Sequence, residues 1–429
     1  MYMKRLLSTS FLLVFAIFSI ACCSKEPIPP NNPTPCLFDC DDLSKLEVVW
    51  SKPINGNDNN YSNLQPFVYN SSIIFGATSE GSNNETIYSF DVNTGDYIWK
   101  WNDYFSSASA FNLTSKIEVY NNLGVISNNY RDYVISLETG STVWRYETPA
   151  GVSSMPRGSL IGNWIFHPQD VEGAPGTDSI AHMARTSIDN PNWEIIYTLR
   201  RDSTGCDVNF EPPSLAIATN GDSLLLFQRR SYNFVSGGDR QDLIAFNLKT
   251  KSVIWKIDNI AKPYTSSVHP ILIKGNIAVF FGGHTVFGIN IVNGSIIWTY
   301  TGANPELNSL LDASCLIEGD RLYVKTEGDQ MYCLNVNTGV RAWVQIIEWS
   351  GQHSNLIYNN GKIYFTVYEK LYCINAFNGA VIFRYRSPNS DRKDQTGRFK
   401  GYGGLAIDPI AKRMYFADSY YMNCVKLPE

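Results

Sequence analysis

Few side chains in this 429-residue sequence could support catalysis or metal binding, because it holds only nine cysteines and five histidines. The histidines show no helical or hairpin spacing typical of a metal site, and they are His167, His182, His269, His284 and His353. No Cys-x-x-Cys sequence occurs, so neither a zinc site nor a dithiol redox site is indicated. We expect hydrogen-bonded structural histidines, although His269 and His353 could also line the mouth of a channel.

Two pairs of cysteines lie close together in the sequence. Cys22 and Cys23 are adjacent, whereas Cys36 and Cys40 flank Leu-Phe-Asp. In an oxidising compartment Cys36 and Cys40 could form a local disulfide. Two free thiols, or a spacing too strained to bridge, are the alternatives for this pair.

The N-terminus has the pattern of an export signal. Lys4 and Arg5 form a short basic region, and residues 6–21 are apolar apart from four hydroxyl-bearing side chains. A membrane-spanning helix needs ~20 apolar residues. The shorter stretch found here fits a signal peptide better.

The end of that stretch, Ser-Ile-Ala-Cys at residues 19–22, resembles a bacterial lipobox, in which a cysteine is lipidated and becomes the new N-terminus. The resemblance implies a signal peptide over residues 1–22 and a lipid on Cys22. Ser19 stands where Leu is usual, and Cys23 is an alternative lipid acceptor. An ordinary secretory signal is the remaining alternative.

Residues 23–44 form the expected tether between the lipid and the folded domain. A proline-rich stretch stays extended and semi-rigid, and its prolines are Pro27, Pro29, Pro30, Pro33 and Pro35. Asp after the lipidated cysteine is the inner-membrane retention signal of bacterial lipoproteins, and Cys23 is not Asp. We therefore expect an outer-membrane lipoprotein that faces the periplasm or the cell surface.

The composition favours strands and excludes a nucleic-acid partner bound by charge. Hydrophobic residues make up 44% of the chain and aromatic residues 13%, whereas charged residues make up only 17%. Aromatic side chains are enriched in strands. The net charge of −5 and the pI of about 5.7 are unfavourable for a polyanion.

A short phrase repeats along the chain. It reads Asp-Val-Asn-Thr-Gly-Asp-Tyr-Ile-Trp at residues 91–99 and recurs at residues 290–298 and 335–343. Weaker copies lie at residues 136–144, 189–197, 247–255 and 375–383. An Asp or Asn side chain can bond the amides of a turn, and Gly readily adopts a positive φ. Each phrase therefore predicts a β-hairpin whose second strand carries a large aromatic residue.

These aromatic residues are the predicted docking residues between repeats. They are Trp50, Trp99, Trp144, Tyr197, Trp255, Trp298, Trp343 and Phe383. A small residue two positions before the Asp or Asn would leave room for each ring, and these residues are Ser89, Ala245, Gly288, Cys333 and Cys373, with Cys424 in the last repeat. Cys206 and Cys315 have no assigned role. In the degenerate copy, Trp193 stands in the glycine position, so we expect it to be largely exposed.

A second set of hairpins precedes the phrases and gives the number of repeats. Their turns lie near residues 69–70, 121–122, 162–163, 220–221, 274–275, 318–319, 360–361 and 409–410. Residues 46–52 match a final strand without a hairpin before it, and residues 404–427 supply three strands without a fourth. The sequence therefore predicts an all-β fold over residues 45–429. It is an eight-bladed β-propeller with four-stranded antiparallel blades, in which the N-terminal strand closes the last blade.

The phrase resembles the docking motif of eight-bladed quinoprotein (PQQ-type) propellers, and the resemblance covers about residues 46–427. It implies that each tryptophan stacks between the small residue of its own motif and a turn of the neighbouring blade. Dehydrogenases of that family also use a buried Asp base, a Ca²⁺ ion held by carboxylate and amide side chains, and often a disulfide between adjacent cysteines. Here the adjacent cysteines lie in the export signal, and neither the long insertions nor a matching carboxylate set is found. We expect no cofactor, no metal and no enzyme activity, with a PQQ-dependent dehydrogenase as the less favoured alternative.

Four long segments share one predicted face of the propeller, namely residues 167–182, 200–213, 229–241 and 387–403. Binding residues concentrate on loops that a rigid scaffold holds. The last segment carries a basic cluster on an otherwise acidic protein, made of Arg392, Lys393, Arg398 and Lys400. This cluster is a candidate interaction loop, and a solvated loop is the other interpretation.

Two functions follow from these features. A lipid-anchored, non-catalytic propeller resembles the BamB-type subunit of the outer-membrane β-barrel assembly machinery, which implies a scaffold that binds an outer-membrane or periplasmic protein. We expect such a chain to be a monomer. The alternative is a cell-surface lipoprotein that binds a glycan or peptide on the long-loop face. Aromatic residues there would suit stacking on sugars, and they are Tyr104, Phe105, Tyr232, Phe234 and Tyr402.

Overall fold

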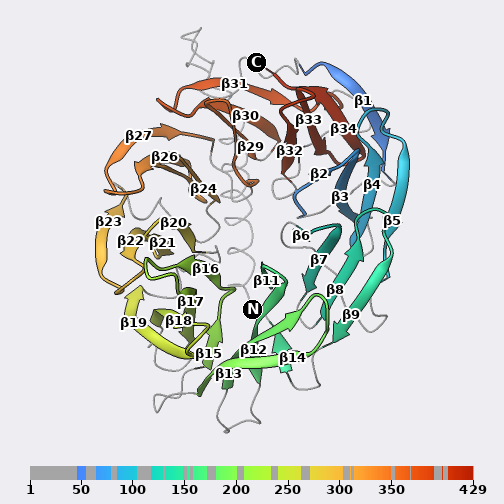
Figure 1. Cartoon of the computed structure of the whole chain (residues 1–429). Coiled ribbons are helices and arrows are strands. Elements are labelled where there is room, and N and C mark those ends of the chain that lie inside the picture. Colours follow the sequence, from blue (N-terminus) through green and yellow to red (C-terminus); the bar gives the residue numbers. More distant parts are fainter. Residues whose placement is uncertain are drawn as a thin grey trace, which may run out of the picture. The chain divides into compact units, whose positions relative to one another are not determined.

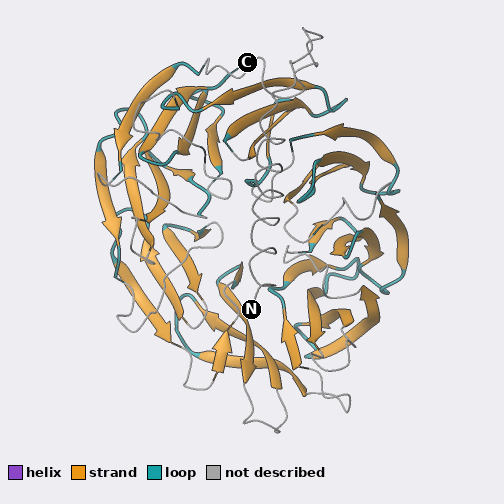
Figure 2. Cartoon of the chain, turned by 180° about the vertical axis from the view of Figure 1, so that it is seen from behind, coloured by secondary structure: helices purple, strands orange, loops and turns teal. Residues whose placement is uncertain are grey.

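The computed structural model describes residues 46–54, 64–78, 85–103, 117–128, 131–147, 152–154, 158–171, 180–200, 207–232, 240–261, 271–302, 310, 314–348, 353–367, 369–390, 399 and 404–428. They all belong to one compact unit, residues 42–429. These residues form strands, turns and loops, without a helix among them (Figure 2). No helix of the described part is therefore long and apolar enough to cross a membrane.

Eight antiparallel sheets follow one another around a ring (Figure 1). The first four blades are β2–β5 (Phe67–Tyr69, Ser72–Thr78, Glu85–Asp91, Tyr97–Trp101), β6–β9 (Glu118–Tyr120, Leu123–Asn128, Arg131–Ser136, Thr142–Glu147), β10–β14 (Val152–Ser154, Ser159–Ile161, Trp164–Val171, Ile180–Ser187, Trp193–Arg200) and β15–β19 (Asp207–Phe210, Ser214–Ile217, Ser223–Tyr232, Arg240–Asn247, Ser252–Ala261). In blades 3 and 4 two short strands share the innermost position, because β10 and β11 both pair with β12, and β15 and β16 both pair with β17.

The remaining blades have four strands each. They are β20–β23 (Leu272–Lys274, Ile277–Gly282, Thr285–Asn290, Ile296–Thr301), β24–β27 (Ser314–Glu318, Arg321–Lys325, Gln330–Asn335, Arg341–Ile346), β28–β31 (Ile357–Asn359, Lys362–Val367, Lys370–Asn375, Val381–Arg386) and β32–β34 (Leu405–Asp408, Arg413–Ala417, Tyr421–Lys426) with β1 (Val48–Pro53).

The N-terminal strand closes the ring, as the sequence predicted. Strand β1 pairs with β34, and Trp50 lies opposite Cys424. The last blade therefore joins the two ends of the described chain, with strand order β1-β34-β33-β32. Pairing with β1 covers the edge of β34, which would otherwise be open.

A β-bulge recurs in the outer strand of all eight blades. The register shifts by one residue directly before the docking aromatic, as at Val49 before Trp50 and at Ile297 before Trp298. The other shifts precede Trp99, Trp144, Tyr197, Trp255, Trp343 and Phe383. A bulge increases the local twist and redirects side chains, so it turns each aromatic ring toward the neighbouring blade.

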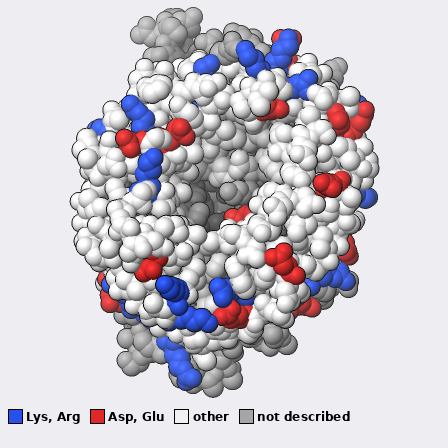
Figure 3. Space-filling model, viewed as in Figure 1, with Lys and Arg blue, Asp and Glu red and all other residues white. Residues whose placement is uncertain are grey.

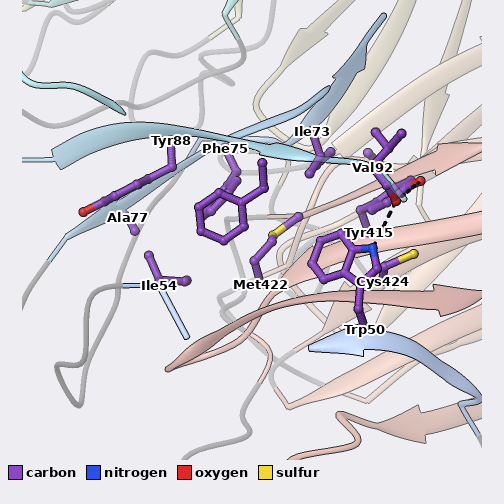
Figure 4. Close-up of a cluster of buried hydrophobic side chains, with 12 residues drawn as sticks. Trp50, Ile54, Ile73, Phe75, Ala77, Tyr88, Val92, Tyr415, Met422 and Cys424 are labelled. Atoms are coloured by element: carbon purple, nitrogen blue, oxygen red, sulfur yellow. Dashed lines mark hydrogen bonds between the residues drawn. The ribbon is translucent and has the colours of Figure 1, made fainter. Parts of the chain in front are cut away.

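The hydrophobic core consists of eight clusters, one at each junction between adjacent blades. Figure 4 shows the junction that closes the ring, where Trp50 and Met422 face Phe75 and Ile73 of the first blade. Stability therefore depends on packing between blades rather than on a single central core.

Charged side chains form small separate groups around a hollow between the blades (Figure 3).

Candidate functional site

Six tryptophans bind the neighbouring blade through the indole N–H. Each Nε1 donates to the carbonyl oxygen of the first turn residue after the third strand of the next blade. The pairs are Trp50 with Val92 (3.0 Å), Trp99 with Leu137 (3.2 Å), Trp144 with Ile188 (2.7 Å), Trp255 with Ile291 (2.8 Å), Trp298 with Val336 (2.9 Å) and Trp343 with Ala376 (3.1 Å). Figure 4 shows the first of these bonds. A buried indole needs such a partner for its polar atom.

One of these rings, that of Trp298, fills the space above two glycines. A Cβ atom on Gly288 would lie 2.1 Å from Trp298 Cε2, and one on Gly339 of the next blade would lie 2.6 Å from Trp298 Cε3. Turn glycines meet the preceding blade's tryptophan in the same way at Gly95, Gly140, Gly294 and Gly379. The tryptophans therefore lie between their own blade and the turn of the next, in the arrangement that the quinoprotein resemblance implied.

The third blade differs from this arrangement. Tyr197 lies opposite Met183, deep in β13, whereas Trp99 lies opposite Ser89, two residues before the end of β4. The tyrosine ring instead packs on three phenylalanines of the fourth blade, with centroid distances of 5.7 Å to Phe210, 5.8 Å to Phe227 and 5.6 Å to Phe246. Tyr197 therefore contacts the next blade, but not at its turn.

The predicted exposure of Trp193 was wrong. Strand β13 ends at Ser187, and Ile188 N donates to Asn163 O as Val92 N donates to Ser71 O in the first blade. Trp193 is therefore the first residue of β14 rather than part of the turn, and it is half-buried with its Nε1 atom out of contact with water. The turn between β13 and β14 therefore begins two residues earlier than the weak repeat at residues 189–197 predicted.

Charged side chains occupy the place of the aromatic–glycine contact between blades 3 and 4. Lys251 takes the turn position with a φ of 53°, and its Nζ lies 3.0 Å from Glu194 Oε1. Arg185 Nη2 lies 2.9 Å from Glu194 Oε2, and its guanidinium lies 4.1 Å above the Trp164 ring. Hydrogen bonds from Lys251 and Arg185 lower the pKa of the Glu194 carboxyl. Glu194 stands where other blades have the aromatic residue, and Lys251 stands where they have the turn glycine. Their ion pair replaces the contact that both substitutions remove.

Phe383 docks differently because the eighth blade has no turn between its outer strands. It lies opposite Cys373, and its ring stacks on Tyr385 with a centroid distance of 4.5 Å. The strands of blade 8 that would be joined by a turn are β34 and β1, which come from opposite ends of the described chain. The missing turn explains why this junction uses Phe instead of Trp, since no carbonyl in a hairpin turn awaits an indole N–H.

Buried charges lie in the fourth blade, where the long segment 229–241 leaves β17 and returns to β18. Arg229 Nη1 lies 3.0 Å from Asp242 Oδ2, and Lys256 Nζ lies 3.3 Å from the same oxygen. Beside them, Arg230 Nε lies 3.0 Å from Glu211 Oε1. Charges removed from water need such pairing. Sequence analysis missed this cluster, because nothing in a strand of alternating residues marks which charge will be buried.

A buried lysine in the sixth blade was also missed. Lys325 is fully buried, and its Nζ donates to the carbonyl oxygens of Thr326 and Gly328, each at 2.6 Å. Burial lowers its pKa to about 7, against the opposing effect of Asp329 and Glu327. The hairpin between β25 and β26 thus wraps its carbonyls around one ammonium group.

Three of the described histidines have a polar partner at Nδ1, which agrees with the structural role that the sequence analysis expected. His353 Nδ1 lies 3.1 Å from Ser314 Oγ, His182 Nδ1 lies 2.9 Å from Thr198 Oγ1, and His167 Nδ1 lies 3.3 Å from Asp132 Oδ2. His269 lies outside the described residues. The Asp132–His167 contact joins two blades and was not foreseen.

Among the described cysteines, Cys333, Cys373 and Cys424 are buried and Cys315 is partly buried, and none has the lowered pKa of a reactive thiol. Burial raises the pKa of Cys315 and Cys373 to about 12 and that of Cys424 to about 11, and it also raises the pKa of Cys333. The thiolate is the reactive form of cysteine, so these groups act as small apolar side chains. Cys22, Cys36, Cys40 and Cys206 lie outside the described residues.

The basic loop is held at both ends. Asn389 Nδ2 donates to Asp418 Oδ2 at 2.7 Å and to Asn423 Oδ1 at 3.0 Å, and Ser51 Oγ of the closing strand donates to the same Asn423 oxygen. Phe399 is buried against Phe416, with a centroid distance of 4.7 Å. The four basic residues between and beyond these anchors, Arg392, Lys393, Arg398 and Lys400, lie outside the described part.

Within the described residues no group of three or more His, Cys, Asp and Glu side chains could hold a metal ion. The aromatic residues proposed for sugar stacking lie outside the described side chains. What the described structure defines is a rigid ring whose contacts serve blade packing. In class, the protein is an eight-bladed β-propeller with PQQ-like repeats.

Comparisons with known proteins agree with this class. A family model described as outer membrane protein assembly factor BamB matches residues 226–356, which run from β17 to the segment before β28. The chain is 21% identical over 357 residues to the outer membrane protein assembly factor BamB of Salmonella typhimurium strain LT2, which covers 79% of each chain. The chain is thus similar to BamB at low identity over most of its length.

Solved structures extend the similarity of fold. BamB from Moraxella catarrhalis superposes with a TM-score of 0.54 at 12% identity, over 89% of this chain and 99% of that chain. The quinohemoprotein alcohol dehydrogenase from Comamonas testosteroni superposes with a TM-score of 0.63 at 9% identity, over 91% and 78%. One propeller fold thus serves an assembly factor and an oxidoreductase, so the fold alone does not decide the function.

Proposed function

We propose that this protein is a non-catalytic scaffold of the outer membrane, anchored by a lipid on Cys22, that takes part in the assembly of outer-membrane proteins. The observation that carries the proposal is the relation to BamB over 79% of both chains. The rigid ring supports it, since closure by β1 and eight packed junctions would present a constant surface to a partner.

The proposed architecture places the signal peptide at residues 1–22, the tether at residues 23–44 and the propeller at residues 45–429. The partner is an outer-membrane or periplasmic protein, and the propeller is a monomer. The basic residues of the loop between Asn389 and Phe399, with Lys400 after it, would bind an acidic surface on this partner.

A pull-down from solubilised outer membranes tests the proposal. We expect the tagged full-length protein to retain a membrane-embedded barrel protein, which mass spectrometry identifies. Recovery of no outer-membrane protein, from a preparation in which the bait is folded and lipidated, would contradict the scaffold function.

Two matched variants test the loop. We expect Lys393→Ser with Lys400→Ser to weaken the pull-down, whereas Lys100→Ser with Lys249→Ser, which removes two exposed lysines elsewhere, should not. An equal loss in both variants would indicate an effect of net charge instead of this loop.

Two further measurements address the rival functions. Protease digestion of intact cells that removes the propeller would favour the cell-surface ligand-binding protein. Dye-linked alcohol oxidation after reconstitution with PQQ and Ca²⁺ would establish the dehydrogenase and overturn the non-catalytic proposal.

A further inference from the structure

Seven of the eight junctions bury a pair of apolar residues at equivalent positions. One comes from the third strand of a blade, four positions before its last residue, and the other comes from the second strand of the next blade. The pairs are Ile87 with Ile126, Met183 with Phe227, Leu243 with Phe280, Val286 with Val324, Met331 with Phe365, Leu371 with Phe416, and Met422 with Phe75. All are at most 3% exposed. The pair is thus a constant element of the core.

The junction between blades 2 and 3 breaks this pattern. The equivalent residues are Asp132 in β8 and His167 in β12, and their side chains are each 5% exposed. His167 Nδ1 lies 3.3 Å from Asp132 Oδ2, and Ser127 Oγ donates to Asp132 Oδ1 at 2.7 Å. Among the described residues, the apolar cluster at this junction has four buried members, whereas the other clusters have eight to twelve. The ring therefore has one polar seam.

The seam also holds buried polar atoms without partners. With its Nδ1 proton directed at the Asp132 carboxylate, neutral His167 keeps a lone pair on Nε2, and Nε2 has no hydrogen-bond partner. Both amide atoms of Gln169, two residues along the same face of β12, are likewise buried and unpartnered. A proton added to His167 Nε2 would be a buried donor without an acceptor, which costs ~1–3 kcal/mol.

We propose that the junction between blades 2 and 3 is a pH-responsive seam that opens locally on mild acidification while the other seven junctions stay closed. In the open seam His167 meets water and takes up a proton readily, whereas in the closed seam it does not. Acid therefore favours opening at this junction, since the equivalent pair at each of the other seven junctions carries no titratable side chain.

The pKa shifts set the pH window. Burial lowers the pKa of His167 from its usual value of 6.5, so the stabilisation that depends on neutral His167 is present above pH 6.5 and is lost as the pH falls below it. Burial raises the pKa of Asp132 from its usual value of 3.8, so protonation of Asp132 favours the closed seam and opposes the effect of His167 as the pH falls. The loss of stabilisation should therefore begin as the pH falls below 6.5.

Other titratable groups near the seam are few in the described part. Tyr146 of β9 lies opposite Asp132, and burial followed by the Asp132 charge raises its pKa, so it stays neutral in this range. His182 of β13 lies opposite Gln169, and burial lowers its pKa. Glu118 of β6 accepts a hydrogen bond from Leu160 N of β11 across the same junction. His182 and Glu118 are therefore the described neighbours whose titration must be separated from that of His167.

Amide hydrogen exchange of the full chain at pH 7.5 and pH 5.5, corrected for intrinsic rates, tests the seam. We expect protection in β8 and β12 to fall by up to about tenfold at pH 5.5, the limit for one proton over one pH unit below 6.5. Protection in β3 and β34, which carry the apolar pair Phe75 and Met422, should remain unchanged. An equal fall around all eight junctions would overturn the proposal.

Substitutions identify the group responsible. The double variant Asp132→Met with His167→Phe copies the Met–Phe pair of three other junctions, those between blades 3 and 4, blades 6 and 7, and blades 8 and 1. It should remove the pH effect. His167→Gln, which keeps a donor toward Asp132 but does not titrate, should remove it too if the double variant fails to fold. His182→Gln should retain it. A full pH effect in His167→Gln, or its loss in His182→Gln, would assign the response to another group and refute the seam.

Discussion

At the junction of blades 5 and 6, Trp298 fills the space between Gly288 and Gly339 and bonds Val336 through its indole N–H. At the junction of blades 3 and 4, the corresponding place holds Glu194 and Lys251, and the tyrosine lies deeper, against three phenylalanines. The first contact is dry and leaves no room for a larger residue, whereas the second is half-exposed and adaptable. Adjacent blades therefore need a contact at the turn, and at one junction an ion pair can replace the contact between tryptophan and glycine.

The largest effect should come from Trp298→Ala. The indole is 8% exposed and lies between two blades, and truncation of such a residue costs ~3–5 kcal/mol. The lost contact should also separate the unfolding of adjacent blades, so the transition should broaden. Urea denaturation followed by circular dichroism measures both effects.

Trp193→Ala is the control for that substitution. Trp193 is only half-buried at the start of β14, so we expect a loss of about 1 kcal/mol. If the two variants lose equal stability, the stack between Gly288 and Gly339 is not the main contribution of Trp298.

Gly339→Ala should have the next largest effect. Its φ of +70° disfavours any side chain, and the added Cβ would meet Trp298 at 2.6 Å. A positive φ costs ~1–2 kcal/mol, and overpacking adds ~1–3 kcal/mol. Gly319→Ala has a similar φ of +57° with nothing within 4 Å of the new Cβ, so it should show the first cost alone. Equal melting temperatures for the two variants would mean that the indole moves aside freely.

Glu194→Gln should have a small effect. The carboxylate pairs with Lys251 and Arg185, and their side chains are 36%, 62% and 20% exposed. Ion pairs in such positions contribute ~0–1 kcal/mol and weaken with salt. We expect the difference from the native protein to vanish at 1 M NaCl. A loss that persists at high salt would show that Glu194 contributes by packing.

The smallest effect should come from Lys251→Gly, which restores the usual turn residue. Glycine relieves the positive φ of 53°, and this gain offsets the lost ion pair with Glu194. We expect a change in the free energy of unfolding within about 0.5 kcal/mol. A large loss would mean that the Lys251–Glu194 pair is the essential link between these blades.

The number of blades and the way the ring closes could be predicted because both depend on local patterns. Turn residues, alternating strands and an aromatic at a fixed offset are visible in the sequence, and a surplus first strand matched a missing last one. The third blade was misplaced by two residues because neither its turn nor its glycine position carries the usual residue. Its bulge directly precedes the aromatic, as in the other blades, but Tyr197 lies farther from the turn than the other docking residues do. Packing on Phe210 and Phe227 decides that position.

By itself, the sequence determined the all-β class, the eight repeats and the residues that face the neighbouring blades, because each of these depends on residues a few positions apart. Only the tertiary structure decided which side chains meet across the junctions. Asp132 and His167, or Glu194 and Lys251, are about one repeat apart, and no local pattern relates them. Their contacts arise from the way one blade rests on the next, and this is why the polar seam became visible only when all eight junctions could be compared.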